Sequence, residues 1–275
     1  MEVSALPDSV IELILEKHAS IKDSTLEAAD LQKLSRCDLT ATDGTLTELC
    51  RLFAYNAGEY ERQAEPRRLS RLLSKLRASA DSRLLDIGCG GGQTALLIHE
   101  AAGCECFGVD VDSRAVRFGK RIAGFKGLRA VGLSVAKGES LPFERNSFSH
   151  VVCRVAINYM HQRLAIREML RVLNPGGVLY LQVENAGMDL RLIRSGKTLR
   201  SSFAASIEFG FGLLHAAVGY QFDMRSFPGC PGRLFVMNAR LTADLRNQGC
   251  DILSVEALSH IWGIRCASVL VARKR

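Results

Sequence analysis

One aspartate and three glycines at alternate positions follow a short apolar run and could bind a charged ligand. The stretch LLDIGCGGGQTA covers residues 84–95 and places Asp86 before Gly88, Gly90 and Gly92. A glycine-rich turn between a strand and a helix is where open parallel sheets bind ligands. Glycine adopts positive φ and lets the backbone approach a ligand, while a helix N-terminus offers free N–H groups to an anion. The stretch therefore indicates a site for a small ligand with an anionic group.

These glycines do not have the spacing of a dinucleotide site. The dinucleotide fingerprint needs glycine at its first, third and sixth positions. Counted from Gly88, the third residue is Gly90 but the sixth is Gln93. The pattern that fits is an acidic residue followed by glycine at every second position. It resembles the first motif of class I S-adenosylmethionine (SAM) methyltransferases of the small-molecule, UbiE-like type.

The resemblance implies SAM as the cofactor. SAM carries an α-amino-acid head, so its carboxylate can meet free N–H groups while Asp86 favours its ammonium. Asp110 ends the next apolar run in GVDVD (108–112), where a carboxylate can accept hydrogen bonds from both ribose hydroxyls. A glycine turn without a ligand and a simple turn aspartate are the plainer alternatives.

Two further stretches carry the resemblance. GESLPFERNSFSHVVC (138–153) is similar to the family's segment along the adenine, although Lys137 and Ser149 replace its usual aspartates. RLFAYNAGEYERQ (51–63) resembles a helix that covers the cofactor, with Tyr55 as a second candidate aromatic. The resemblance implies no metal site, and it implies these cofactor-binding residues: Tyr60, Asp86, Gly88, Cys89, Gly90, Gly92, Asp110, Val111, Gly138, Glu139 and Arg154.

The implied reaction is in-line methyl transfer from a sulfonium to a nucleophile, which requires alignment and a deprotonated attacking atom. The candidate catalytic residues are His161 and Tyr159 in CRVAINYMHQ (153–162) and His215 further along the chain. Asn158 lies in the same stretch and is a further candidate to contact the acceptor. Imidazole titrates near neutral pH, so His161 could be the general base, or simply the residue that begins a helix. The family's Asn/Asp-Pro-Pro-aromatic motif is absent, which counts against methylation of planar amino nitrogens.

The elements that must position these residues alternate between strand and helix from residue 83. Expected strands cover 84–88, 104–110, 128–135, 150–155, 178–184, 251–258 and 266–273. Expected helices cover 67–77, 93–102, 113–124 with Ser113 as its cap, 165–173 and 241–249. The alternation predicts an α/β fold with a doubly wound, mostly parallel seven-stranded sheet.

The resemblance and the pattern together divide the chain into four parts. Residues 1–80 form a helical N-terminal extension that covers the active site, and 81–185 form the SAM-binding Rossmann-like core. Residues 186–239 form a helical cap inserted after the fifth strand, the substrate lid, and 240–275 complete the core. Scattered phenylalanines in the insertion could line an apolar acceptor pocket or form the core of the cap: Phe203, Phe209, Phe211, Phe222, Phe227 and Phe235.

The amino-acid composition indicates the cellular location of the protein and the kind of partner it binds. The net charge of +7 is a mild bias toward anionic partners, and no apolar run reaches the length of a membrane span. Nine cysteines without metal-ligand spacing, together with no signal-peptide pattern, favour a cytoplasmic location with free thiols.

Three functions are consistent with this sequence. The leading hypothesis is a SAM-dependent methyltransferase acting on a small, apolar or aromatic molecule. The alternative is an RNA or protein methyltransferase, for which the basic helix at 67–77 and the RKR terminus speak. The third is a SAM-binding regulator without activity.

Overall fold

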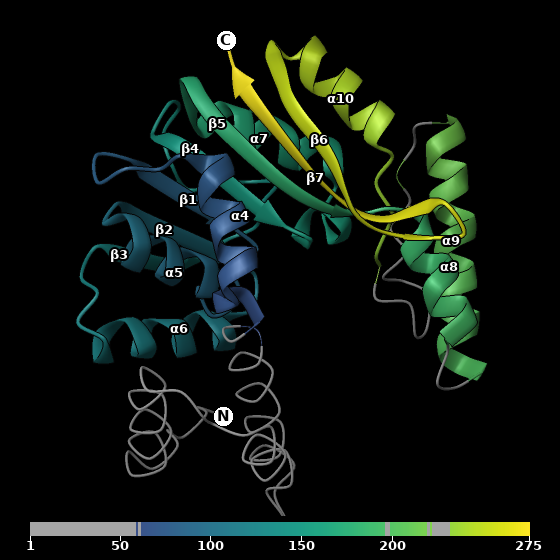
Figure 1. Ribbon diagram of the computed structural model, residues 1–275, viewed down its shortest axis with the longest axis horizontal. Helices are drawn as coiled ribbons and strands as arrows, with labels where there is room; N and C mark the ends of the chain where they lie inside the picture. Colours follow the sequence, from purple (N-terminus) through teal and green to yellow (C-terminus); the bar gives the residue numbers. More distant parts are fainter. Residues whose placement is uncertain (1–58, 60–61, 196–198, 219–220, 222–231) are drawn as a thin grey trace, which may run out of the picture.

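The computed structural model describes residue 59 and residues 62–195, 199–218, 221 and 232–275 (Figure 1). These residues contain a seven-stranded sheet with the strand order β3-β2-β1-β4-β5-β7-β6. The strands β1 to β5 run parallel, and β7 pairs antiparallel with both β5 and β6. The strand bounds are Arg83–Ile87 (β1), Glu105–Asp110 (β2), Val131–Val135 (β3), Phe148–Arg154 (β4), Leu173–Glu184 (β5), Cys250–Ile261 (β6) and Ile264–Lys274 (β7).

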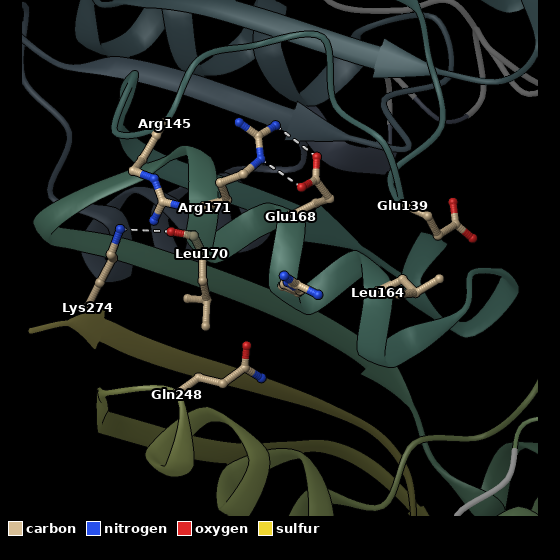
Figure 2. A pocket seen from close by; sticks show the side chains of 9 residues that line it. Glu139, Arg145, Leu164, Glu168, Leu170, Arg171, Gln248 and Lys274 are labelled. Atoms are coloured by element: carbon tan, nitrogen blue, oxygen red, sulfur yellow. Dashed lines mark hydrogen bonds and ion pairs between the residues drawn. The ribbon is translucent and has the colours of Figure 1, made fainter.

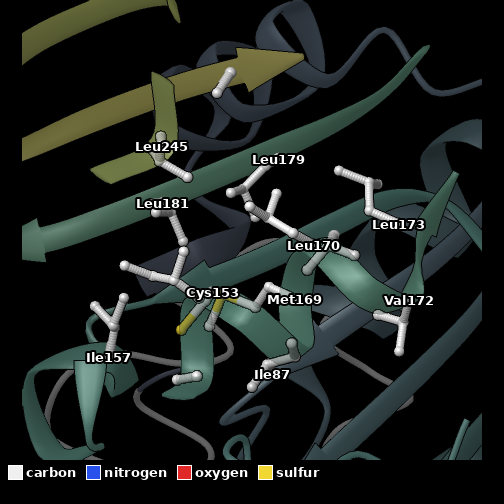
Figure 3. Packing of buried hydrophobic residues seen from close by; sticks show 14 of the residues in the cluster. Ile87, Cys153, Ile157, Met169, Leu170, Val172, Leu173, Leu179, Leu181 and Leu245 are labelled. Atoms are coloured by element: carbon white, nitrogen blue, oxygen red, sulfur yellow. The ribbon is translucent and has the colours of Figure 1, made fainter. Parts of the chain in front are cut away.

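Helices cover both faces of this sheet, so the predicted doubly wound α/β fold is confirmed. The helices α4 (Pro66–Leu76), α5 (Gln93–Ala102) and α6 (Ser113–Phe125) pack on one face through buried residues such as Leu76, Leu96 and Val116. The helices α7 (Gln162–Val172) and α10 (Asn238–Asn247) pack on the other face. Figure 3 shows this second core, where Met169 and Leu245 meet Leu181 of β5.

The amphipathic pattern of α4 explains its position. Leu72 and Leu76, four residues apart, are buried against the sheet, while Arg67 and Arg68 are exposed. The Glu65 side chain accepts hydrogen bonds from the backbone N–H groups of Arg67 and Arg68 and so caps the helix.

The element boundaries differ from expectation at three places. The predicted cap of α6, Ser113, is wrong: Asp112 is the N-cap, and its carboxylate accepts from the Arg114 N–H at 2.9 Å. The strand β5 begins at Leu173, whereas the expected strand began at residue 178. The last helix begins at Asn238 rather than at residue 241.

The inserted segment forms α8 (Ala186–Ser195) and α9 (Leu199–Val218), which pack on each other. The long hairpin of β6 and β7 extends beyond the sheet to reach α8 (Figure 1). Among the described residues, the longest apolar stretch of any helix falls short of what a bilayer crossing requires. Most of the expected N-terminal extension, 1–58, lies outside the described residues.

Candidate active site

The strand order reverses at β1, which lies between β2 and β4, and this switch point is where open α/β sheets bind ligands. The loop after β1 has left-handed backbone at three glycines, with φ of 71° at Gly88, 56° at Gly90 and 77° at Gly92. A side chain at Gly88 would collide with Ala156 from the segment after β4. Only glycine therefore fits there, and the loops after β1 and β4 lie in direct contact.

Asp110 joins the glycine loop to the end of β2. Its Oδ2 accepts a hydrogen bond from the Gly90 N–H at 2.8 Å, and its Oδ1 accepts from the Asp112 N–H at 2.9 Å. Each carboxylate oxygen has a second lone pair, so both can still accept from a ligand hydroxyl. The aspartate therefore has a structural role in the loop, which the sequence reasoning did not foresee.

Asp86 lies at the bottom of the site with only 2% of its surface exposed. Burial raises the pKa of its carboxyl group to about 7, although the nearby charge of Arg154 acts in the opposite direction. Its Oδ2 is buried and has no hydrogen-bond partner among the described residues. Such an atom costs free energy unless a ligand donor satisfies it.

Arg154, at the end of β4, is held by neutral groups. Its Nε donates to Gln182 Oε1 and its Nη1 donates to Thr94 Oγ1, both at 3.3 Å. Burial lowers the pKa of this guanidinium, and the positive charges of Arg68 and Arg62 act in the same direction. Arg68 and Arg62 each pair with a carboxylate of their own, Glu65 and Glu59, whereas Arg154 has no ion pair among the described residues.

The loop after β3 approaches the same edge of the sheet. A Cβ at Gly138 would lie 2.6 Å from Met160 Sδ, so a side chain there would displace the end of the Met160 side chain. Glu139 Oε1 accepts a hydrogen bond from the His161 N–H at 2.8 Å. The structure therefore brings Gly138 and Glu139 beside the segment that contains the expected catalytic residues.

The three expected catalytic residues occupy different environments. His161 and His215 line one cavity of about 160 Å³, together with apolar residues that include Phe235. His161 is exposed, whereas His215 is buried. Tyr159 is 44% exposed and does not line this cavity.

The remaining expected residues are placed as follows. Val111 is 65% exposed just after β2, whereas Cys89 is buried, and burial raises the pKa of its thiol. Cys89 is therefore a packing residue of the loop rather than a nucleophile. Tyr60 and Tyr55 lie outside the described residues.

The phenylalanines of the insertion also differ in their environments. The Phe209 and Phe235 rings lie 6.0 Å apart, but Phe203 is 68% exposed and lines neither of the two cavities described for this structure. Phe203 therefore does not belong to the core of the cap. Phe222 and Phe227 lie outside the described residues.

Asn158 does not point to a substrate, contrary to its place among the candidates. Its Nδ2 donates to the carbonyl oxygens of Glu184 and Leu234, and its Oδ1 accepts from the Glu184 N–H at 3.0 Å. The fully buried amide therefore ties the segment after β4 to β5 and to the chain that enters α10.

A buried ionic cluster was missed by the sequence reasoning. Arg233, 3% exposed, pairs with Glu184 at 3.0 Å, with Glu208 at 3.2 Å and with Asp189. Burial raises the pKa of Asp189 to about 6 and also raises that of Glu208. The signal was the lone Glu208 inside the apolar run SFAASIEFGFGLL, since a buried carboxylate needs a partner.

Comparisons with known proteins agree with this arrangement. Residues 85–181 match the family described as a methyltransferase domain. The chain is 36% identical over 129 residues to an uncharacterized methyltransferase, YcgJ of Bacillus subtilis. This match covers 46% of this chain and 51% of that protein. It is 29% identical over 109 residues to the ubiquinone/menaquinone biosynthesis C-methyltransferase UbiE of Geotalea daltonii, covering 38% of this chain and 46% of that protein. The chain thus spans about half the length of these curated relatives.

Solved structures share the fold. The crystal structure of YcgJ covers 75% of this chain and 97% of its own, with a TM-score of 0.53 and 21% identity. A geranyl diphosphate methyltransferase in complex with GPP and sinefungin covers 86% of this chain and 84% of its own, with a TM-score of 0.56 and 18% identity. The motif, the strand order and the matched family lead to one conclusion: residues 85–181 match a methyltransferase domain, and the described residues have the Rossmann-like fold of a solved methyltransferase.

Proposed function

We propose that this protein transfers a methyl group from SAM to a small, apolar or aromatic acceptor. The observation that carries the proposal is the buried Asp86 Oδ2, which has no partner among the described residues and lies at the switch point of the sheet. A ligand ammonium would satisfy this oxygen. The glycine loop supports the same conclusion, because side chains at Gly88 or Gly138 would occupy the space between the loops.

Each part of SAM has a matching group in the chain. The charge of Arg154 suits its α-carboxylate, and Asp86 suits its ammonium. The free lone pairs of Asp110 suit the ribose hydroxyls, and the 138–139 segment suits the adenine.

SAM supplies an electrophilic methyl group on a sulfonium. The residues of this chain must hold its amino-acid head, exclude water and accept the proton that the attacking atom loses. We propose that the acceptor lies between the 154–161 segment and the inserted helices. The cavity shared by His161 and His215 supports this position, since it combines an apolar wall with imidazoles that could accept a proton. Tyr159 is a third candidate near the same segment.

The names of related proteins favour a small acceptor. One relative is named for quinone biosynthesis, and one structure contains a geranyl diphosphate methyltransferase with its substrate. The alternative, an RNA or protein acceptor, rests on the exposed arginines of α4. That helix buries a clean leucine stripe, so an ordinary solvated face explains its charges more simply.

The test uses SAM with a radioactive methyl group, incubated with the pure protein and a cell extract. The extract is then separated into small molecules, RNA and protein. Label in the small-molecule fraction supports the proposal and yields a compound for mass analysis. Label that RNase or protease removes contradicts the small-molecule acceptor, and no transfer to any fraction despite SAM binding favours the inactive regulator.

We also propose a cytoplasmic location. Six of the cysteines are described, and all are free and buried, which suits a reducing compartment.

A further inference from the structure

A second cavity, of about 390 Å³, lies beside the proposed SAM site and shares only Glu139 with it (Figure 2). Its walls are α7, the 139–145 loop, the end of α10 at Gln248 and the end of β7 at Lys274. Neither Asp86 nor the glycine loop lines it. The volume falls within the range of about 300–1,000 Å³ that is usual for small-ligand pockets.

Basic side chains outnumber acidic ones in this cavity. Four cations line it, against two carboxylates, and both carboxylates have partners. Glu168 pairs with Arg171 at 2.7 Å and also accepts from the Leu141 N–H. Glu139 accepts from the His161 N–H. The cations that line the cavity are Arg145, Arg167, Arg171 and Lys274.

Lys274 carries a charge that no carboxylate balances within the described residues. Its Nζ donates to three neutral oxygens, Leu173 O at 2.6 Å, Leu170 O at 2.8 Å and Asn146 Oδ1 at 2.8 Å. Partial burial lowers the pKa of this ammonium, and the charge of Arg145 lowers it further. Figure 2 shows the Arg145 guanidinium directed toward Lys274. Two like charges thus share one wall of the cavity.

Arg145 and Arg167 supply the free hydrogen-bond donors. Both are exposed, and neither has a side-chain hydrogen bond or ion pair within the described part of the chain. Arg171, by contrast, is occupied by Glu168 and by the carbonyl oxygens of Phe143 and Leu141. A planar guanidinium with free N–H groups matches the geometry of a phosphate group.

We propose that this cavity binds the phosphate group of a small molecule between Arg145 and Arg167, with Lys274 as a fixed positive charge behind them. A phosphate dianion offsets the unbalanced charge, and Leu164 and Leu170 offer apolar contact to the organic part of a phosphate ester. A single-stranded nucleic acid fits less well, because no aromatic side chain lines the cavity for a base to stack on.

The test titrates the full chain with inorganic phosphate, with phenyl phosphate and with a short single-stranded RNA by calorimetry, at low ionic strength in a phosphate-free buffer. Low salt is needed because exposed charges are strongly screened. Arg145→Ala and Arg167→Ala each remove charge-assisted hydrogen bonds and should weaken phosphate binding by about 10- to 100-fold. The matched control is Arg117→Ala, an exposed arginine on α6 that should leave binding unchanged.

Binding of S-adenosylhomocysteine to the same variants separates this inference from the proposed function and from misfolding. Unchanged affinity for it, together with the loss of phosphate binding, supports the phosphate site. The site is rejected if the wild-type protein binds neither phosphate probe, if Arg117→Ala loses as much affinity, or if only single-stranded RNA binds.

Discussion

The glycine-loop region and the Arg233 cluster both bury charged side chains, but they differ in how those charges are paired. At the glycine loop, the Asp86 carboxylate is buried, and its Oδ2 has no hydrogen-bond partner among the described residues. At the inserted helices, the Arg233 guanidinium pairs with three carboxylates, those of Glu184, Asp189 and Glu208. A buried oxygen without a partner can accept from a ligand, whereas paired charges from different elements hold those elements together.

The two regions are also joined to each other through β5. Gln182 accepts from Arg154 at one region, and Glu184, two residues later on the same face, accepts from Arg233 at the other. The glycine-loop region leaves a buried oxygen for a ligand, while the Arg233 cluster holds α8 and α9 against the sheet. The first region is built for binding and the second for holding the cap in place.

The largest effect should come from breaking the Arg233 cluster. Arg233→Met removes the only cation that pairs with Glu184, Asp189 and Glu208 in the described part of the chain and leaves these carboxylates uncompensated. The expected cost is about 3–5 kcal/mol of unfolding free energy, measured by urea denaturation. Arg246→Met, at an exposed arginine of the neighbouring α10, is the control and should cost much less. Equal losses in the two variants would mean that the cluster does not hold the cap.

The next effect concerns the pH dependence of stability. The pKa of Asp86 is raised from 3.8 to about 7, so the folded protein binds this proton more tightly than the unfolded chain does. The resulting stabilisation is complete below pH 3.8 and is lost as the pH rises to about 7, up to about 4 kcal/mol. Asp86→Asn should remove this part of the decline in urea titrations at pH 5 and pH 8 without ligand.

Asp189 should contribute a similar but smaller decline, because its pKa is raised to about 6. The decline in stability that Asp189 contributes therefore remains in the Asp86→Asn protein. Asp251→Asn, at an aspartate with 56% of its side chain exposed, is the matched control. If the unfolding free energy falls as steeply with pH in Asp86→Asn as in the wild type, then ionisation of Asp86 does not destabilise the folded protein.

A moderate effect is expected at the ribose. Asp110→Ala should weaken SAM binding by about 1–3 kcal/mol, since it removes hydrogen bonds to a charged group and also frees the Gly90 N–H from its partner. Titration calorimetry measures the loss, and Asp81→Ala on the surface serves as the control. Unchanged SAM affinity would reject the ribose assignment.

The smallest effect is expected at the adenine segment. Glu139→Ala removes one hydrogen bond, that from the His161 N–H, and should change SAM affinity by about 0.5–1.5 kcal/mol. Glu144→Ala, exposed in the same loop, should have no effect in the same calorimetric assay. A loss larger than that of Asp110→Ala would place more of the binding energy at the adenine than we expect.

Local pattern was enough to predict the sheet and the glycine loop. The Asp86–Gly92 motif and the alternation of strands and helices depend on residues that lie near one another in sequence. The Arg233 cluster depends on contacts between residues 25 to 49 positions apart, and no periodicity reveals such contacts. Asn158 was misassigned for the same reason, because its partners Glu184 and Leu234 lie far along the chain.

The central claim is that the glycine loop binds SAM, and calorimetric titration with S-adenosylhomocysteine and with NAD tests it most directly. The account predicts one-to-one binding of S-adenosylhomocysteine, weakened in Asp110→Ala, and no binding of NAD, because Gln93 stands where the dinucleotide fingerprint needs glycine. Binding of NAD in its place, or no heat with either ligand, would contradict the account.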